Sequence, residues 1–124
     1  MKNLLILLVV VLGGCYWDNE EVLYPDGTSN CDTTNVTYSG TIFPIINDNC
    51  ISCHSGAAPT GGLLLEDYAT ISNQAQIPAG QPGSLYGAIS HASGNSPMPQ
   101  NGNKLTDCGI LKVKKWIDAG TPNN

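Results

Sequence analysis

The chain has 124 residues, with ten carboxylates against five lysines, no arginine and a net charge of −5. This acidic balance excludes nucleic acid as a partner, because binding to phosphates requires a basic surface. Frequent glycine and proline and few aromatic residues indicate a small, loop-rich domain that needs a staple such as a disulfide, a metal or a large cofactor.

The first residues are typical of an export signal. Lys2 precedes the apolar run 4–12, which is too short to span a bilayer but fits the apolar region of a signal peptide. The run ends in "LGGC", which resembles the bacterial lipobox, where the cysteine is lipidated and becomes the new N-terminus. We therefore expect residues 1–14 to be a lipoprotein signal peptide and Cys15 to be a lipid anchor. The alternative is an ordinary signal that is cut elsewhere and leaves Cys15 as a free thiol.

An anchored Cys15 would place the protein in the cell envelope, on the periplasmic face of a bacterial membrane or at the cell surface. Residues 15–35 are polar and turn-rich, and we expect them to form the anchor and a tether. Residues 36–124 remain as one domain of about 90 residues, which is near the lower size limit for a self-sufficient core.

Four short helices are predicted in this domain, and no run of strands. Apolar periodicity and turn signals place them at 41–49, 66–73, 84–90 and from a cap at Thr106 to just before Gly120. Long loops connect them, and the domain has too little apolar material to fill its own centre. The fold class is therefore all-α, with something large missing from the core.

Cys50, Cys53 and His54 form the motif "CISCH". The two cysteines lie one helical turn apart, so both sulfurs can reach the two vinyl groups of a haem while the histidine turns to the iron. A thioredoxin-type pair would need a βαβ setting, and a structural zinc would need a second pair of ligands. The spacing favours one covalent haem c, and the alternative is a disulfide between Cys50 and Cys53.

From about residue 36 onwards the chain resembles the small monohaem c-type cytochromes of bacterial envelopes. The resemblance rests on "CISCH", on the turn "PTGGLLL", on the loop "SPMPQNGNKL" and on a last helix that closes in "KKWIDAGTP". It implies a cytochrome c-like domain of helices and long loops around the haem, with the first and last helices packed together. It also implies one-electron transfer rather than catalysis.

The second axial ligand is expected to be Met98, the only methionine left once the signal is removed. Pro97 and Pro99 flank it and would stiffen the loop that presents it. Its thioether is a soft ligand that raises the reduction potential of the haem. The competitor is His91, the only other histidine, which would give bis-His ligation; otherwise Met98 only fills the core.

The remaining cysteines, Cys31 and Cys108, are expected to pair as a disulfide in an exported protein, the alternative being two buried free thiols. The imidazole of His54 should donate its far N–H to a carbonyl in the segment 55–61. Apolar walls for the haem are expected from residues 63–65, Ile110 and Trp116. With no arginine available, the propionates would turn to Lys104, Trp116, Tyr86 or the backbone of loop 95–103.

Three functions remain open on these residues. The first is electron transfer by one His/Met-ligated haem, with redox proteins as transient partners that dock at the haem edge. The second is a haem enzyme or sensor with a labile sixth ligand for peroxide or a gas, although no distal acid–base pair is visible. The third is a haem-free disulfide scaffold for adhesion, which leaves His54 without a role.

Overall fold

A computed structural model of the chain describes residues 31–100 and 102–124, so the predicted signal peptide, Cys15 and most of the predicted tether lie outside the described residues. In the described ranges the chain forms four α-helices and no strand: α3 (Phe43–Asn49), α4 (Tyr68–Ala75), α5 (Leu85–Ile89) and α6 (Asp107–Asp118). A π-helical turn, η2 (Tyr38–Ile42), leads into α3, and a 3₁₀ turn, η3 (Thr60–Gly62), lies between α3 and α4. The all-α prediction is confirmed.

The first helical segment begins earlier than the sequence predicts. Thr37 is extended, and its hydroxyl accepts a hydrogen bond from the backbone N–H of Gly40, so η2 starts at Tyr38 rather than at residue 41. Because the apolar pattern begins only at Ile42, the sequence did not indicate this first turn. Pro44 lies in the first turn of α3, directly after the π-helical turn, where the N–H of the preceding Phe43 donates to the carbonyl of Tyr38.

The other three helices are defined by polar caps at their N-termini. Asp67 accepts from Thr70 N, Ser84 from Gly87 N and Thr106 from Gly109 N. Because Asp67 is extended, α4 runs from Tyr68 to Ala75, two residues later than predicted. The limits predicted for α5 and α6 are confirmed to within a residue or two.

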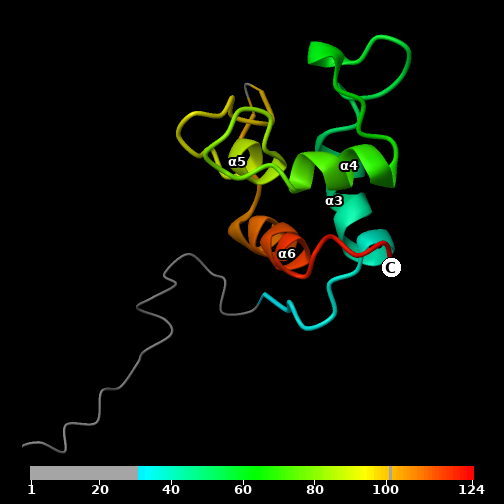
Figure 1. Ribbon diagram of the computed structural model, residues 1–124, viewed down its shortest axis with the longest axis vertical. Helices are drawn as coiled ribbons and strands as arrows, with labels where there is room; N and C mark the ends of the chain where they lie inside the picture. Colours follow the sequence, from blue (N-terminus) through cyan, green and yellow to red (C-terminus); the bar gives the residue numbers. More distant parts are fainter. Residues whose placement is uncertain (1–30, 101) are drawn as a thin grey trace, which may run out of the picture.

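The core lies between the helices and takes side chains from η2, α3, α4, α5 and α6. The helices are arranged around it with η2 against α6 (Figure 1). Its most completely buried side chains include Ile42, Ile46, Val113 and Trp116, each at most 1 % exposed. The ring centroids of Tyr38 and Trp116 are 5.8 Å apart, so the first and last helical segments pack directly on each other. Each such buried side chain stabilises the fold by about 1.5–3 kcal/mol relative to exposure.

The C-terminal tail closes over this core. Tyr68 Oη donates to the carbonyl of Thr121 (2.6 Å), and the indole N–H of Trp116 donates to the carbonyl of Pro122 (2.9 Å). The N–H of Ser39 donates to the carbonyl of Asn124 (2.9 Å), which brings the end of the chain beside η2 (Figure 1). The tail therefore connects α4, α6 and η2.

The predicted disulfide between Cys31 and Cys108 is present, with 5.4 Å between the two Cα atoms. It attaches residue 31 to α6, so the end of the predicted tether lies against the domain five residues before the predicted boundary at Val36. None of the helices in the described ranges has the length and apolar character needed to cross a membrane.

Candidate functional site

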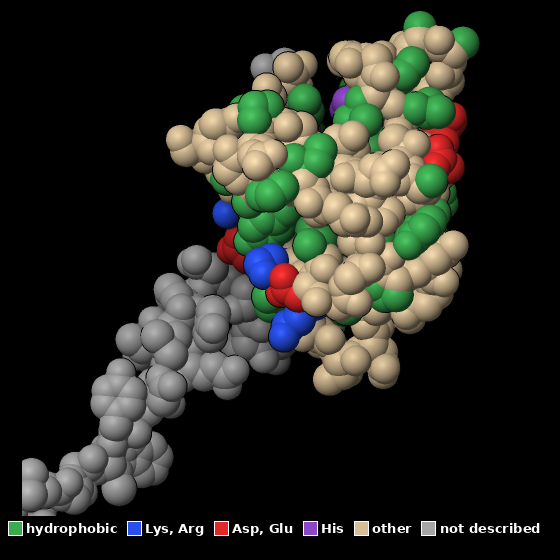
Figure 2. All heavy atoms as spheres, in the orientation of Figure 1, with side chains coloured by type: hydrophobic (Ala, Val, Ile, Leu, Met, Phe, Trp, Pro, Cys, Tyr) green, Lys and Arg blue, Asp and Glu red, His purple; other side chains and the backbone are tan. Residues whose placement is uncertain are grey.

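A cavity of about 460 Å³ opens between the loops around η3 and the region of α5. This volume lies within the range of roughly 300–1,000 Å³ that is usual for small-molecule and cofactor sites. Figure 2 shows the molecule hollowed between these two parts, with most charged side chains of this face gathered lower, over α6, and along one edge. Twenty-one of the described residues line the cavity, and none of these is Asp, Glu, Lys or Arg.

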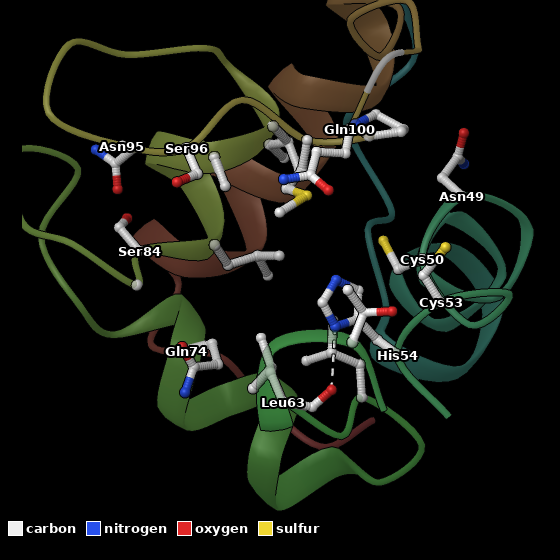
Figure 3. A pocket seen from close by; sticks show the side chains of 18 of the residues that line it. Asn49, Cys50, Cys53, His54, Leu63, Gln74, Ser84, Asn95, Ser96 and Gln100 are labelled. Carbon is white, nitrogen blue, oxygen red and sulfur yellow. Dashed lines mark hydrogen bonds between the residues drawn. The ribbon is translucent and has the colours of Figure 1, made fainter. Parts of the chain in front are cut away.

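Cys50, Cys53 and His54 form one wall of this cavity. The helix α3 ends at Asn49, but the N–H groups of Cys53 and His54 both donate to the carbonyl of Cys50, at 3.1 and 2.9 Å. This extra turn holds both sulfurs on the same side of the cavity, beside the imidazole (Figure 3). The predicted one-turn spacing therefore brings the three side chains together.

The two cysteines are free thiols and are not bonded to each other. Burial raises the pKa of the Cys50 thiol to about 11, so that thiol stays protonated at neutral pH. A reactive redox pair or a zinc ligand needs a thiolate, which a lowered pKa favours. In the described parts of the chain, moreover, no three His, Cys, Asp or Glu residues are grouped so that they could hold a metal ion.

His54 is half-buried, and its ring orientation is fixed by a backbone carbonyl. Its Nδ1 lies 3.0 Å from the carbonyl oxygen of Leu63, and because a carbonyl only accepts, Nδ1 carries the proton. When the ring carries only this one proton, its lone pair is at the other nitrogen, Nε2, which faces the cavity (Figure 3). A lone pair at this position can bind a metal ion.

The partner of His54 corrects the prediction of a carbonyl in segment 55–61. That segment turns outward through η3, where Gly61 and Gly62 have φ of 66° and 71°, a conformation that favours glycine. The chain then returns beside the motif, where the N–H of Leu65 donates to the carbonyl of His54 (2.8 Å). Leu63 is therefore the residue that reaches the imidazole, two positions beyond the predicted segment.

Met98 lines the same cavity and is half-buried. Its N–H donates to the carbonyl of Ala88 at the end of α5 (3.0 Å), which attaches its loop to that helix. His91 is exposed and does not line the cavity. The structure thus brings Met98 together with Cys50, Cys53 and His54, and leaves the competing histidine outside.

The predicted walls are only partly correct. Leu63 and Leu65 line the cavity, but Ile110 and Trp116 do not, because both are buried in the core around α6. The indole N–H of Trp116 is also already used by Pro122, so it is no propionate partner. Among the other candidates, Lys104 pairs with Asp107 (3.1 Å), and neither Lys104 nor Tyr86 lines the cavity. Of the predicted propionate partners, only the backbone of loop 95–103 remains.

The sequence indicated Asn95 only as part of the backbone of loop 95–103, and not through its side chain. Its amide Nδ2 donates to the carbonyl of Ala79, while its buried Oδ1 has no hydrogen-bond partner. A Cβ atom on Gly87 would lie 2.5 Å from the carbonyl of Ala79, so only glycine lets the loop with Asn95 approach α5 this closely. Asparagine is common in turn-rich loops, so the sequence alone could not predict the contact between its side chain and Ala79.

The chain was compared with models of protein families, with curated proteins and with solved structures, and none of the three comparisons gives a match.

Proposed function

We propose that this protein is an electron carrier with one haem c, bound covalently by Cys50 and Cys53 and ligated by His54 and Met98. The observation that carries the proposal is that these four side chains line one cavity although Met98 lies 44 residues beyond His54. The resemblance of residues 36–124 to small monohaem cytochromes supports the finer assignment of the fold as cytochrome c-like.

The residues of the cavity fit the group. Two free thiols on the same wall can each add across a vinyl group, with the sulfur and the hydrogen both retained in the product, so attachment needs no oxidant. His54 offers an unprotonated nitrogen whose direction is fixed by Leu63, and Met98 offers a soft sulfur. The haem would supply a one-electron couple, and Leu63, Leu65 and Ile89 would shield it from water.

The lining of the cavity distinguishes this proposal from the enzyme or sensor. Apart from the cysteines of the motif, His54 is the only ionisable side chain among the described residues of the lining, and its Nδ1 already carries the proton donated to Leu63. Peroxide or oxygen chemistry would require a further acid or base within reach of the bound molecule. The adhesion scaffold, in turn, gives no reason for a cavity that contains His54 and Met98.

For its location and partners, we propose a lipid anchor at Cys15 and transient docking of redox proteins at the mouth of the cavity. Cys53, Asn49 and Gln100 are exposed there and uncharged. A partner would contact this mouth through a small interface, since electron-transfer complexes are at the low end of interface size. The anchor would keep the domain close to membrane-bound partners.

The proposal is tested by expressing the full chain with a haem-attachment system and measuring the intact mass after denaturation. The expected product carries one covalent haem, and Cys50→Ala combined with Cys53→Ala carries none. In the oxidised protein, Met98→Ala should abolish the weak thioether-to-iron absorption and lower the midpoint potential, because a softer ligand favours the reduced state.

Two results would contradict the assignment. A wild-type protein without covalent haem rules out both haem functions and favours the scaffold. A reduced wild-type protein that binds carbon monoxide as fast as Met98→Ala does has an open iron, which favours the enzyme or sensor.

A further inference from the structure

His91 has an unusual backbone conformation at the end of α5. The helix closes at Ser90, and His91 follows with φ of 57°, in the left-handed region. Glycine is the usual residue at this position after a helix, because a Cβ atom is strained there. A histidine in this conformation is uncommon, and an uncommon conformation persists where the surrounding contacts require it.

The contact made by the ring is with the backbone of Met98. His91 Nε2 lies 3.2 Å from the carbonyl oxygen of Met98, and a carbonyl only accepts, so Nε2–H donates. The N–H of Met98 is held at its other side by the carbonyl of Ala88 (3.0 Å). Both peptide groups of Met98 are therefore attached to the end of α5, one of them through an imidazole.

The neighbours of Met98 cannot replace this attachment. Pro97 and Pro99 have no N–H, so neither can donate a backbone hydrogen bond. Of the three residues 97–99, only Met98 has an N–H, and its carbonyl is the one that His91 reaches. Loss of the imidazole would leave the Met98 carbonyl without its partner in the described part of the chain.

We infer that His91 is a positioning residue that holds the Met98 loop in the orientation in which the thioether faces the cavity. The inference rests on the proposed function, because it takes Met98 to be an axial ligand. His91 does not line the cavity and acts only through the Met98 backbone. The hydrogen bond from the imidazole to Met98, rather than the left-handed backbone, then explains why a histidine occupies a position that suits glycine.

Three variants distinguish the hydrogen bond of the His91 imidazole from the backbone conformation of residue 91. His91→Gly and His91→Asn both suit the left-handed conformation, but glycine has no donor and the asparagine amide ends one bond short of the position of Nε2. His91→Gln places an amide nitrogen at the same number of bonds from the backbone as Nε2 and can restore the donor. All three are made in the full, haem-loaded protein.

The measurements are hydrogen exchange at the Met98 amide, the temperature at which the thioether-to-iron band is half lost, and the global Tm. In His91→Gly and His91→Asn the Met98 N–H keeps its bond to Ala88, but the loop loses the hydrogen bond at the Met98 carbonyl and opens more often. We therefore expect exchange about 2- to 10-fold faster, as for loss of one exposed hydrogen bond, and loss of the band at a lower temperature. Their Tm should be equal or higher, because the strain is removed. His91→Gln should keep wild-type exchange although its Tm is not raised.

This opposite response of loop and fold would not arise from a purely structural role. The inference is overturned if His91→Gly exchanges like wild type and keeps its band to the same temperature. It is also overturned if Gln and Asn behave alike. A wild-type protein with covalent haem but no thioether band removes Met98 as ligand and the inference with it, whereas a wild-type protein without covalent haem removes the proposed function itself.

Discussion

The disulfide between Cys31 and Cys108 offers the perturbation whose size is best defined by the structure. It joins residues 77 positions apart, so it closes a loop that contains nearly the whole described domain. Replacing both cysteines by serine removes the link without leaving an unpaired thiol. In the chain-entropy model, a loop of this length is worth about 4.5 kcal/mol, because the linked unfolded chain has fewer conformations.

Other contacts decide how much of this value is observed. Tyr38 and Trp116 pack together, and Ser39 is bonded to Asn124, so the two ends of the domain meet without the disulfide. These contacts keep the native fold intact in the variant, and the loss then comes mainly from the unfolded state. We expect the free energy of unfolding to fall by about 2 to 4.5 kcal/mol, the lower end being the typical value for such a link.

The assay is guanidinium unfolding of the haem-loaded protein, followed by far-UV circular dichroism. The midpoint should decrease and the slope m should increase, because the unlinked chain exposes more surface when unfolded. Asp32→Asn is the matched control: Asp32 is exposed and, within the described ranges, its side chain bonds to Thr34 alone, so the change should stay within about 0.5 kcal/mol. A loss below about 1 kcal/mol with an unchanged m would refute the loop-entropy reasoning.

Two further predictions concern the other cysteines. Cys15→Ser should move the haem-loaded protein from the membrane to the soluble fraction with an unchanged spectrum, and a variant that still sediments after a high-salt wash would contradict the lipid anchor. In the haem-free protein, burial raises the pKa of Cys50 from 9.0 to about 11, so the folded state holds this proton more tightly and stability should fall as the pH rises from 9 to 11. Haem attachment converts this thiol to a thioether and should remove the part of the stability loss that comes from Cys50. Tm measurements from pH 8 to 11 on the haem-free and haem-loaded proteins would detect the difference. Parallel curves of Tm against pH would argue against attachment at Cys50.

Features set by neighbours in the sequence could be predicted, and those set by the return of a distant segment could not. Thr106, Ser84 and Asp67 cap helices through groups three residues away, so the limits of α4, α5 and α6 could be read to within about two residues. The spacing of Cys50 and Cys53 is equally local, because one turn of chain sets it.

The partner of His54 depended instead on how segment 55–62 leaves the motif and returns. Two adjacent glycines in the left-handed conformation allow that turn, and no sequence rule fixes where it comes back. Trp116 is a similar case. Its indole reaches Pro122 only because the tail turns at Thr121, a buried residue with φ of 51° that the sequence did not single out.

The relation between core and cavity explains why the expectation of an unfilled centre was only partly correct. In the described ranges, eleven buried apolar residues from η2, from the four helices and from the loops between them form one core, so the domain does fill its centre with its own side chains. Leu65, Leu85 and Ile89 belong to this core and also line the cavity. We call these three side chains the shared wall, because one side of each is packed in the core and the other side faces the cavity.

The shared wall also shows why the cavity has a defined shape. A side chain that is packed against a core keeps one rotamer, since interiors are nearly as dense as crystals of organic molecules. Leu85 and Ile89 stand on α5, the same helix whose end holds Met98 through Ala88 and His91. Two of the three residues of the shared wall and the groups that hold the Met98 loop therefore lie on α5 or directly after it, and this segment, although the helix is only five residues long, sets Met98 across from the cysteine motif.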